Sequence, residues 1–552
     1  EQLSKDSLVA AGKGGAALSK DALDSGFAVF RRSFDTRKGG FGGAPKFPRP
    51  VVLNFLLRYH ARSKNAEALA MVLQTLREMA KGGMNDQLGG GFHRYSVDGN
   101  WFVPHFEKML YDQAQLAISY LEAYQITGEA FFGITARQIF DYVLRDMTDA
   151  EGGFYSAEDA DSVIDPANPK EKGEGAFYIW KQSEIEGLLD ETAARHFKYC
   201  YGVEPSGNVK EDPHHEFTGR NILFEAHSIA ETAAHFEKQE GVPYLDSVSS
   251  ARMFSSLKAS SAKLLAERAK RVRPHLDDKV LTAWNGMMIS AFAKGGAILN
   301  EPRYATAARS AADFIATRMY DAKGNILLRR YRQGDAAIPG FLDDYAMFVQ
   351  GLLDLYEAQF HLPDFELAIK LTARQRELFE DKENGGFYSS AAGDASLVMR
   401  MKEDYDGAEP SANSVTALNL LRLGQMTGRD DLRQSAERLL QAFASRVMGA
   451  PVTVPQLLVA FDFSLSKPKQ VILVGERGAA LDRLLTELQS RFLPNHIALL
   501  IDGEPARKML SGYLGVVETM TAIGGKPTAY VCENYACQLP VSDAEKFAGL
   551  LQ

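Results

Sequence analysis

The sequence predicts a mainly α-helical protein, a double-layered (α/α)6 toroid followed by a small C-terminal α/β module. Apolar residues recur at three- and four-residue spacing from about Asp21 to Met448. A Gly-Gly-aromatic turn returns between the helical stretches. From about residue 466 onward, short apolar strands alternate with a helix instead.

The helical spacing is clear in Leu23, Phe27 and Phe30, which share one helix face. The recurring turns start at Gly39, Gly89, Gly152, Glu174 and Gly385. Glycine supplies the positive φ of a tight turn, and the aromatic residue can pack on a helix end. We therefore expect these turns to lead into short extended pieces that separate helix pairs.

The second glycines of three turns, Gly90, Gly153 and Gly386, indicate a unit of roughly 50 to 60 residues, which is two helices and their connections. A helix hairpin cannot bury its apolar face alone, so the units must pack side by side. Six pairs closing into a ring make a toroid, and an open solenoid is the alternative. We favour closure because the long, irregular loops would gather at one end of a ring.

The C-terminal segment predicts strands from Lys469, His496 and Thr528, and a helix over Ala479 to Ser490. The turn at Gly475 lacks the full dinucleotide fingerprint, so we expect a sheet that packs against the helical body. The predicted organisation is a flexible N-terminal segment over 1–20, the toroid over 21–465 and the α/β module over 466–552.

Composition excludes two classes of partner. The 62 Lys and Arg against 71 Asp and Glu give a net charge of −9 without a long basic block, which argues against nucleic acid. No apolar run reaches the length of a membrane span, so we expect a soluble protein. The three cysteines, Cys200, Cys532 and Cys537, are too few for a disulfide scaffold and favour a cytoplasmic location. We expect neither a metal ion nor a cofactor.

The densest group of ionisable residues lies in WFVPHFEKMLYD, from Trp101 to Asp112. A helix that starts at Pro104 would carry His105, Lys108 and Asp112 on one stripe.

The positive end of that helix would favour Glu107 as its anion and a neutral His105, which suits a base near neutral pH. His93 lies in the preceding glycine-rich loop. The alternative is that these polar groups satisfy one another inside a helix bundle.

A second acidic group, Glu158, Asp159 and Asp161, follows the Gly152 turn. Carboxylates held close together raise at least one pKa, which keeps a general acid protonated. A solvated surface turn is the alternative.

Three further segments carry paired polar residues before helical stretches. They contain Asp343, Asp344 and Tyr345; Asp404, Asp406, Glu409 and Asn413; and His275, Asp277, Asp278, Trp284 and Asn285. Any one aspartate could instead be a helix cap. Capping explains one residue per helix but not pairs.

The tryptophans Trp101, Trp180 and Trp284 all lie in or beside these charged or glycine-rich segments. Flat aromatic faces beside carboxylates, imidazoles and amides are typical of a carbohydrate pocket, where sugar C–H groups pack on the ring. Filling of large holes in the core is the alternative.

The motifs together resemble a known family. They are GGFGGAPKFPRP, GGGFHRYS, WFVPHFEKMLYDQAQL, GGFYSAEDADS, LTAWNG, GFLDDYA, GLLDLYEA, DGAEPSANSV and AYVCENYACQLPV, spread over about Ala22 to Ala544. They resemble the thioredoxin-domain-containing family that includes spermatogenesis-associated protein 20.

The resemblance implies an N-terminal thioredoxin-like domain in the full-length chain, before Glu1, which would carry any redox role. It also implies an (α/α)6 region similar to N-acylglucosamine 2-epimerases and six-hairpin glycosidases, and a role in spermatogenesis or fertility.

The sequence therefore favours a carbohydrate-active enzyme with a small-molecule sugar as its partner. In an epimerase, His105 and either His93 or His275 would exchange a proton, with Asp344 and Asp404 holding hydroxyl groups. In a glycosidase, Glu158, Asp159 or Asp161 would be the acid, and Asp344 or Asp404 the base. The alternative is a non-catalytic scaffold that binds a glycan or a protein beside a thioredoxin-like domain.

Overall fold

A closed ring of six helices forms the centre of the part of the chain that the computed structural model describes, residues 17–212, 216–240, 246–393, 399–533 and 536–552. The ring helices are α3 (Pro50–Ser63), α5 (Leu110–Thr127), α11 (Thr282–Ile298), α13 (Leu342–Gln359), α15 (Ala412–Thr427) and α18 (Pro455–Leu465). Each contacts the next, and α18 returns to α3. Closure confirms the toroid, whereas an open solenoid would leave α18 and α3 apart. Most of the expected segment 1–20 lies outside the described residues.

A second layer of helices surrounds the ring. It consists of α2 (Asp21–Ser33), α4 (Ala66–Lys81), α6 (Ala130–Asp146), α12 (Pro302–Arg318), α14 (Leu362–Phe379) and α16 (Asp430–Ala442), with the short α17 (Ala444–Gly449) and η1 (Pro451–Thr453) after it. The ring helices are apolar around most of their circumference because they lie between the axis and this outer layer.

The closest helix contact in the ring joins α11 and α13. A Cβ added to Gly286 would lie 2.5 Å from the backbone carbon of Met347, and one added to Gly351 would lie 2.5 Å from the carbonyl oxygen of Gly286. The two backbones touch because neither glycine carries a side chain.

Four of the five predicted turns, those at Gly39, Gly89, Gly152 and Gly385, separate helix pairs as predicted, and each follows an outer helix. Gly90, Gly91, Gly385 and Gly386 all have positive φ. Each turn closes a short bridge to its aromatic residue, in the pairs Phe34 and Phe41, Asn85 and Phe92, Thr148 and Phe154, and Glu380 and Phe387. The turns are therefore a repeated joint between the two layers.

Short strands connect several of these joints. They are β1 (Tyr95–Ser96), β2 (Pro104–His105), β3 (Lys108–Met109), β4 (Ala157–Glu158), β7 (Leu276–Asp277), β8 (Val280–Leu281), β9 (Tyr320–Asp321), β10 (Ile326–Arg332) and β11 (Asp335–Pro339). Antiparallel pairing joins β1 to β2, β4 to both β3 and β7, and β10 to β8, β9 and β11.

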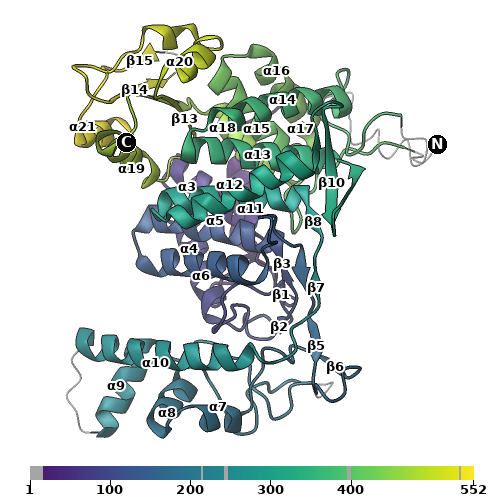
Figure 1. Ribbon diagram of the computed structural model, residues 1–552, viewed down its shortest axis with the longest axis vertical. Helices are drawn as coiled ribbons and strands as arrows, with labels where there is room; N and C mark the ends of the chain where they lie inside the picture. Colours follow the sequence, from purple (N-terminus) through teal and green to yellow (C-terminus); the bar gives the residue numbers. More distant parts are fainter. Residues whose placement is uncertain (1–16, 213–215, 241–245, 394–398, 534–535) are drawn as a thin grey trace.

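An inserted lobe separates α6 from α11 and lies below the ring in Figure 1. It contains β5 (Asp161–Val163), β6 (Lys172–Glu174), α7 (Gln182–Leu188), α8 (Glu191–Cys200), α9 (Ile229–Glu240) and α10 (Asp246–Arg268). Its apolar core, including Trp180, Phe197 and Phe236, is separate from that of the ring. The turn at Glu174 belongs to this lobe, so the expectation that it separates ring units was wrong. The helical spacing of the lobe resembles that of the ring, and the sequence pattern therefore does not distinguish the two.

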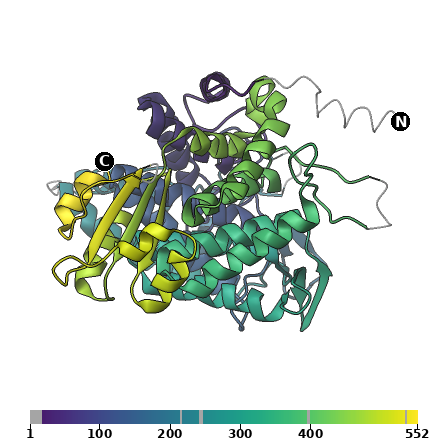
Figure 2. The same cartoon turned by 90° about the horizontal axis from the view of Figure 1, so that it is seen from above.

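The C-terminal module contains the predicted strands and helix in order, β12 (Lys469–Val474), α19 (Ala479–Gln489), β13 (His496–Ile501) and β14 (Thr528–Glu533). It also contains α20 (Glu504–Ser511), η2 (Gly515–Thr519), β15 (Ala536–Cys537) and α21 (Ala544–Leu550), which were not predicted from the sequence. The sheet order is β13-β12-β14-β15, with β12 and β13 parallel. Helix α19 contacts α11, and β13 contacts α13 and α15, so the module packs on one side of the ring (Figure 2).

Two properties of the described residues complete the fold. Cys532 and Cys537 form a disulfide across β14 and β15, and Cys200 is free and buried. None of the helices in the described ranges is long and apolar enough to cross a membrane.

Candidate functional site at the mouth of the ring

The N-terminal ends of four ring helices bring ionisable and aromatic side chains together at one end of the ring. We call this end the mouth and define it by Arg49, Arg94, Tyr111, Asp112, Trp284, Arg329, Asp343, Asp344, Tyr405 and Glu409. In Figure 1 the hairpin of β10 and β11, which carries Arg329, lies on the side opposite the C-terminal module.

Direct contacts link the segments of the mouth. The Trp284 and Tyr111 rings meet edge to face, 5.0 Å between centroids. The Trp284 Nε1 donates a 2.8 Å hydrogen bond to Oε2 of Glu409. Arg329 pairs with Asp343 at 2.9 Å and with Asp344 at 2.8 Å. Helices α5, α11 and α13 and the loop before α15 therefore contribute to one cluster.

A cleft of about 450 Å³ opens at the mouth between the loop of residues 41–50 and the residues Arg94, Tyr111, Asp112 and Tyr405. The buried Lys46 fixes this loop: its Nζ donates to Asp35 at 2.7 Å and to the carbonyl oxygens of Gly39 and Gly99. The wall of the cleft is thus tied to the turn that follows α2.

Asp112 is the carboxyl group that lines the cleft. Its side chain lines the cleft although the residue is only 3% exposed, and Oδ2 has no hydrogen-bond partner among the described residues. Burial raises the pKa of Asp112 well above its usual value, and the Glu409 carboxylate raises it further, against the opposing effect of Arg94. Burial therefore favours the protonated form of Asp112.

Glu409 is the second carboxyl group with a shifted pKa. Burial raises the pKa of Glu409 to about 7, while the hydrogen bond from Trp284 opposes the shift. Near neutral pH this group is partly ionised, which suits a general base.

Asp344 lies at the start of α13 and joins it to α11. One of its oxygens accepts from the backbone N–H of Ala283, and the other accepts from that of Phe341. Burial and the neighbouring Asp343 raise the pKa of Asp344 to about 8, against the Arg329 guanidinium. Both groups predicted here, Asp343 and Asp344, thus lie at the mouth, with Asp344 also serving as a cap.

His105 and Glu107 do not line the cleft, and Glu107 is joined to it only through Arg94. The predicted helix from Pro104 was wrong, because β2 and β3 pair with β1 and β4 and α5 begins only at Leu110. His105, Lys108 and Asp112 therefore do not share a stripe. The Nδ1 of His105 lies 2.7 Å from Glu174, and Glu107 binds Arg94 at 2.9 Å.

The expectation of a neutral His105 was also wrong. Hydrogen bonds that His105 donates to the carboxylates of Glu107 and Glu174 raise the pKa of His105 to about 9. The group is an imidazolium at neutral pH, and it links the ring to the inserted lobe.

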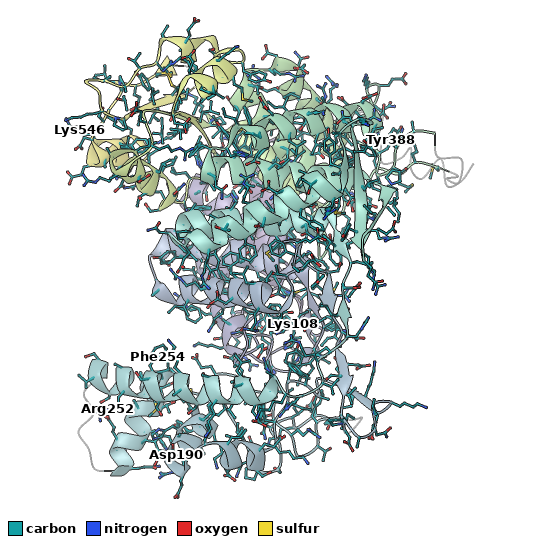
Figure 3. All side chains as sticks on the ribbon, in the orientation of Figure 1. Lys108, Asp190, Arg252, Phe254, Tyr388 and Lys546 are labelled. Carbon is teal, nitrogen blue, oxygen red and sulfur yellow. A yellow bond between two sulfur atoms is a disulfide. The ribbon has the colours of Figure 1, made fainter. Side chains whose placement is uncertain are left out.

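Lys108, Glu158 and His93 belong to a buried network between the ring and the lobe; Figure 3 shows Lys108 at this boundary. Lys108 donates to Asp86 at 3.0 Å, and Arg268 binds the same carboxylate with two 2.7 Å bonds. Glu158 accepts from Tyr142 and Arg273. The Nδ1 of His93 lies 2.9 Å from the carbonyl oxygen of Phe106. These contacts give the three residues a structural role.

Trp101 and Trp180 are buried away from the cleft. The Trp101 Nε1 donates to the carbonyl oxygen of Lys38, its ring packs against Gly40, and its backbone lies against Gly82. Trp180 lies in the core of the lobe beneath Arg271. Only Trp284 of the three tryptophans lies at the mouth, so the other two fill core space.

Asn285 and Asn413 anchor turns and do not face a ligand. Each side chain accepts from the backbone N–H of a turn phenylalanine, Phe154 or Phe387, at 2.8 Å and donates to its carbonyl oxygen at 2.9 Å. Gln113 does the same with Phe92. We call these three amides the staples.

The other predicted residues also have contacts away from the mouth. Asp406 is buried and accepts from the backbone N–H groups of Ser411 and Gln456. Asp404 pairs with Arg446. The Tyr345 hydroxyl accepts from the backbone of Leu327. We therefore remove these residues from the candidate site.

Asp159, Asp161 and His275 are exposed where the chain enters and leaves the lobe. The backbone N–H of Asp159 donates to the carbonyl oxygen of His275, so the two segments pair with each other. None of these three residues lines the cleft at the mouth.

Sequence reasoning missed Arg49, Arg94, Tyr111, Arg329 and Tyr405. Arg94 and Tyr111 stand beside His93 and Asp112 in motifs that had already been singled out. Arg49 precedes Pro50 at the start of a helix, which was the available signal for it. Arg329 lies on β10 and carried no signal.

A second cavity, about 190 Å³, lies between the ring helices and the C-terminal module. Its charged groups pair with one another, Arg58 with Glu122 and Arg422 with both Asp354 and Glu357. The mouth, in contrast, retains the unpartnered carboxyl of Asp112. Within the described ranges no group of three or more His, Cys, Asp or Glu residues could hold a metal ion.

Comparison with known proteins gives two close relatives. Spermatogenesis-associated protein 20 of Homo sapiens is 40% identical over 550 residues, which cover 95% of this chain and 68% of the human protein. The Mus musculus protein of the same name is 39% identical over 555 residues, with the same coverage. No protein-family profile matches the chain.

Solved structures give more distant likenesses. A cellobiose 2-epimerase from Bacillus thermoamylovorans has a TM-score of 0.46 at 9% identity over 76% of this chain and 85% of that one. A D-mannose isomerase has a TM-score of 0.47 at 11% identity over 77% and 86%. Neither likeness is close enough to support an activity. The identity to the human and mouse proteins, over nearly all of this chain, shows that it belongs to the spermatogenesis-associated protein 20 family.

Proposed function

We propose that the protein is a carbohydrate-active enzyme that works at the mouth by carboxyl acid and base chemistry, in the manner of a glycoside hydrolase. One observation carries the proposal: the buried Asp112 carboxyl lines an open cleft and lacks a protein partner among the described residues. A buried polar atom without a partner costs free energy, so such a group is expected to have a ligand to bind.

The two carboxyl groups have different tasks. Burial raises the pKa of Asp112 well above its usual value, which favours the protonated form that can donate to a leaving-group oxygen. Glu409 has a pKa of about 7 and can accept a proton from water in its ionised form. This division into an acid and a base is the requirement of glycoside hydrolysis.

Aromatic rings supply a surface for the sugar. Trp284 and Tyr111 meet at the mouth, and Trp284 is hydrogen-bonded to Glu409. Sugar C–H groups pack on such faces while hydroxyl groups pair with carboxylates.

Epimerisation by two imidazoles has less support. His105 is a poor base at neutral pH because its pKa is raised to about 9. His93 is buried in the network below the ring, and His275 is exposed at the lobe. None of the described residues that line the cleft is a histidine, so no imidazole faces it.

The test is turnover of a panel of oligosaccharides and aryl glycosides in deuterated water. Hydrolysis produces a new reducing end without exchange at C2, whereas epimerisation introduces deuterium at C2. We expect Asp112→Asn and Glu409→Gln each to lower kcat by about 10²- to 10⁴-fold.

Asp404→Asn is the matched control, because it alters a carboxylate on the same loop as Glu409 that pairs with Arg446 instead. Turnover that survives both mouth substitutions would contradict the proposed roles. Sugar binding without turnover would support the scaffold alternative.

A further inference from the structure

Arg49 is a cation of the cleft that has no anionic partner. Its side chain lines the cleft, and within the described ranges it makes no ion pair or side-chain hydrogen bond. Its guanidinium carbon lies 6.0 Å from the ring centroid of Phe30. The other arginine of the cleft lining, Arg94, is paired with Glu107 at 2.9 Å.

The backbone at Arg49 is strained. Its φ of 47° and ψ of 59° are left-handed, a region that costs a non-glycine residue roughly 1 to 2 kcal/mol. A residue before proline also normally prefers an extended backbone, and Arg49 precedes Pro50. Such strain is typically retained where it positions a functional side chain.

The surroundings of Arg49 favour an anion. Arg49 is the N-cap residue of the 14-residue helix α3, so the positive end of that helix lies at its backbone. Asp112 is the only carboxyl group among the residues that line the cleft. No ion pair joins Asp112 to Arg49 among the described residues, and burial raises the pKa of Asp112, which disfavours its anionic form.

We infer that the mouth binds an acidic sugar, whose carboxylate or phosphate group pairs with the guanidinium of Arg49 while the sugar ring lies toward Asp112 and Tyr111. The inference rests on the proposed function and adds the substrate class to it. A guanidinium presents two parallel N–H donors that match a carboxylate or a phosphate, which ammonium cannot do.

The test is calorimetric binding with sugars that differ only in charge: D-glucose against D-glucuronate, D-galactose against D-galacturonate, and D-glucose against glucose 6-phosphate. We expect each acidic sugar to bind at least tenfold more tightly than its neutral counterpart at 50 mM salt, with the advantage shrinking at 300 mM. The uronates and the phosphate show which anion the site prefers.

Two variants isolate the side chain. Arg49→Gln is expected to abolish the preference for acidic sugars, and Arg49→Lys to keep only part of it. Arg49→Gly also removes the guanidinium but suits the left-handed backbone, so it shows the same loss in a protein at least as stable as the wild type. Arg32→Gln, at an exposed position of α2, is the control and keeps the full preference.

The outcomes separate this inference from the proposed function. Equal binding of acidic and neutral sugars, or a preference that survives Arg49→Gly, overturns the acidic-sugar inference and leaves the proposed enzyme intact. Failure of every sugar, charged or neutral, to bind the wild type overturns both.

Discussion

Trp284 donates its indole N–H to Glu409 across 2.8 Å and so joins the first turn of α11 to the loop before α15. This hydrogen bond stabilises the ionised form of Glu409, whose pKa burial raises to about 7. The hydrogen bond therefore increases the fraction of Glu409, the proposed base, that is ionised near neutral pH.

Trp284→Phe should raise the pKa of Glu409 further, because the ring remains but the donor is lost. A hydrogen bond to a charged group is worth about 1.5 kcal/mol, which corresponds to roughly one pH unit. The acid limb of the kcat/KM profile should move upward by that amount. Trp180→Phe, which alters an indole inside the lobe, should leave the limb in place. An unmoved limb in active Trp284→Phe would show that another group titrates.

Asp112→Asn should stabilise the protein above pH 4. The folded pKa of Asp112 lies above the usual 3.8, so between those values the native state holds a proton that the unfolded state has released, and stability falls as pH rises. Asparagine cannot ionise. The free energy of unfolding in urea should exceed that of the wild type by roughly 1 to 3 kcal/mol at pH 8 and by less at pH 4.

Asp159→Asn is the control for this prediction, since Asp159 is exposed. It should give no pH-dependent difference. An Asp112→Asn difference that is the same at both pH values would contradict burial of a protonated carboxyl.

His105 should titrate near pH 9 in the folded protein, well above its ordinary 6.5. Because the folded pKa is raised, the stability that the imidazolium supplies is complete below about pH 6.5 and is lost as the pH rises through about 9. Nuclear magnetic resonance of ring-labelled histidine measures the pKa directly. Glu174→Gln should lower it by about one unit. A pKa near 6.5 for His105 in the wild type would show that Glu107 and Glu174 do not bind its imidazole.

Asp86→Ala should destabilise the protein by about 3 to 5 kcal/mol, because it leaves Lys108 and Arg268 buried without a counter-charge. These two cations lower the pKa of Asp86 well below 3.8, against the opposing effect of burial, which is the largest one. Its stabilising effect is therefore complete above pH 3.8 and is lost as the pH falls below it. Equilibrium unfolding in urea at pH 7 measures the cost.

Asp190→Ala supplies the comparison, because Asp190 caps α8 on the surface of the inserted lobe, which also carries Arg268 (Figure 3). It should cost only about 1 kcal/mol. Equal costs for Asp86→Ala and Asp190→Ala would contradict the structural role of the buried network.

The fold could be predicted because its signals are local. Helical spacing and the turns at Gly90 and Gly386 are properties of short stretches, and closure follows from the need to bury each hairpin. The lobe could not be separated from the ring, because α10 has the same spacing as a ring helix.

The site was predicted in part. Asp112, Trp284, Asp343, Asp344 and Glu409 do meet at the mouth. The predicted directions of the side chains depended on where α5 begins. The helix begins at Leu110 and not at Pro104, so Lys108 lies in a strand and points into the buried network.

The residue type alone gave a wrong prediction for asparagine, because an asparagine amide can either bind a ligand or hold a turn of the backbone. The amides of Asn285 and Asn413 resemble ligand-binding groups in sequence, but their donors and acceptors are used by backbone groups more than 20 residues away. Only coordinates reveal such long-range pairing.

The staples of Gln113, Asn285 and Asn413 have a consequence for how this architecture can diversify. Each staple hydrogen-bonds a turn to the first turns of a ring helix. The position of the turn relative to that helix is therefore fixed, whatever sequence connects the two. The segment between the turn and the ring helix can then accept insertions without displacing either one. The lobe after Phe154 is one such insertion, more than 100 residues long, which the ring accommodates without opening.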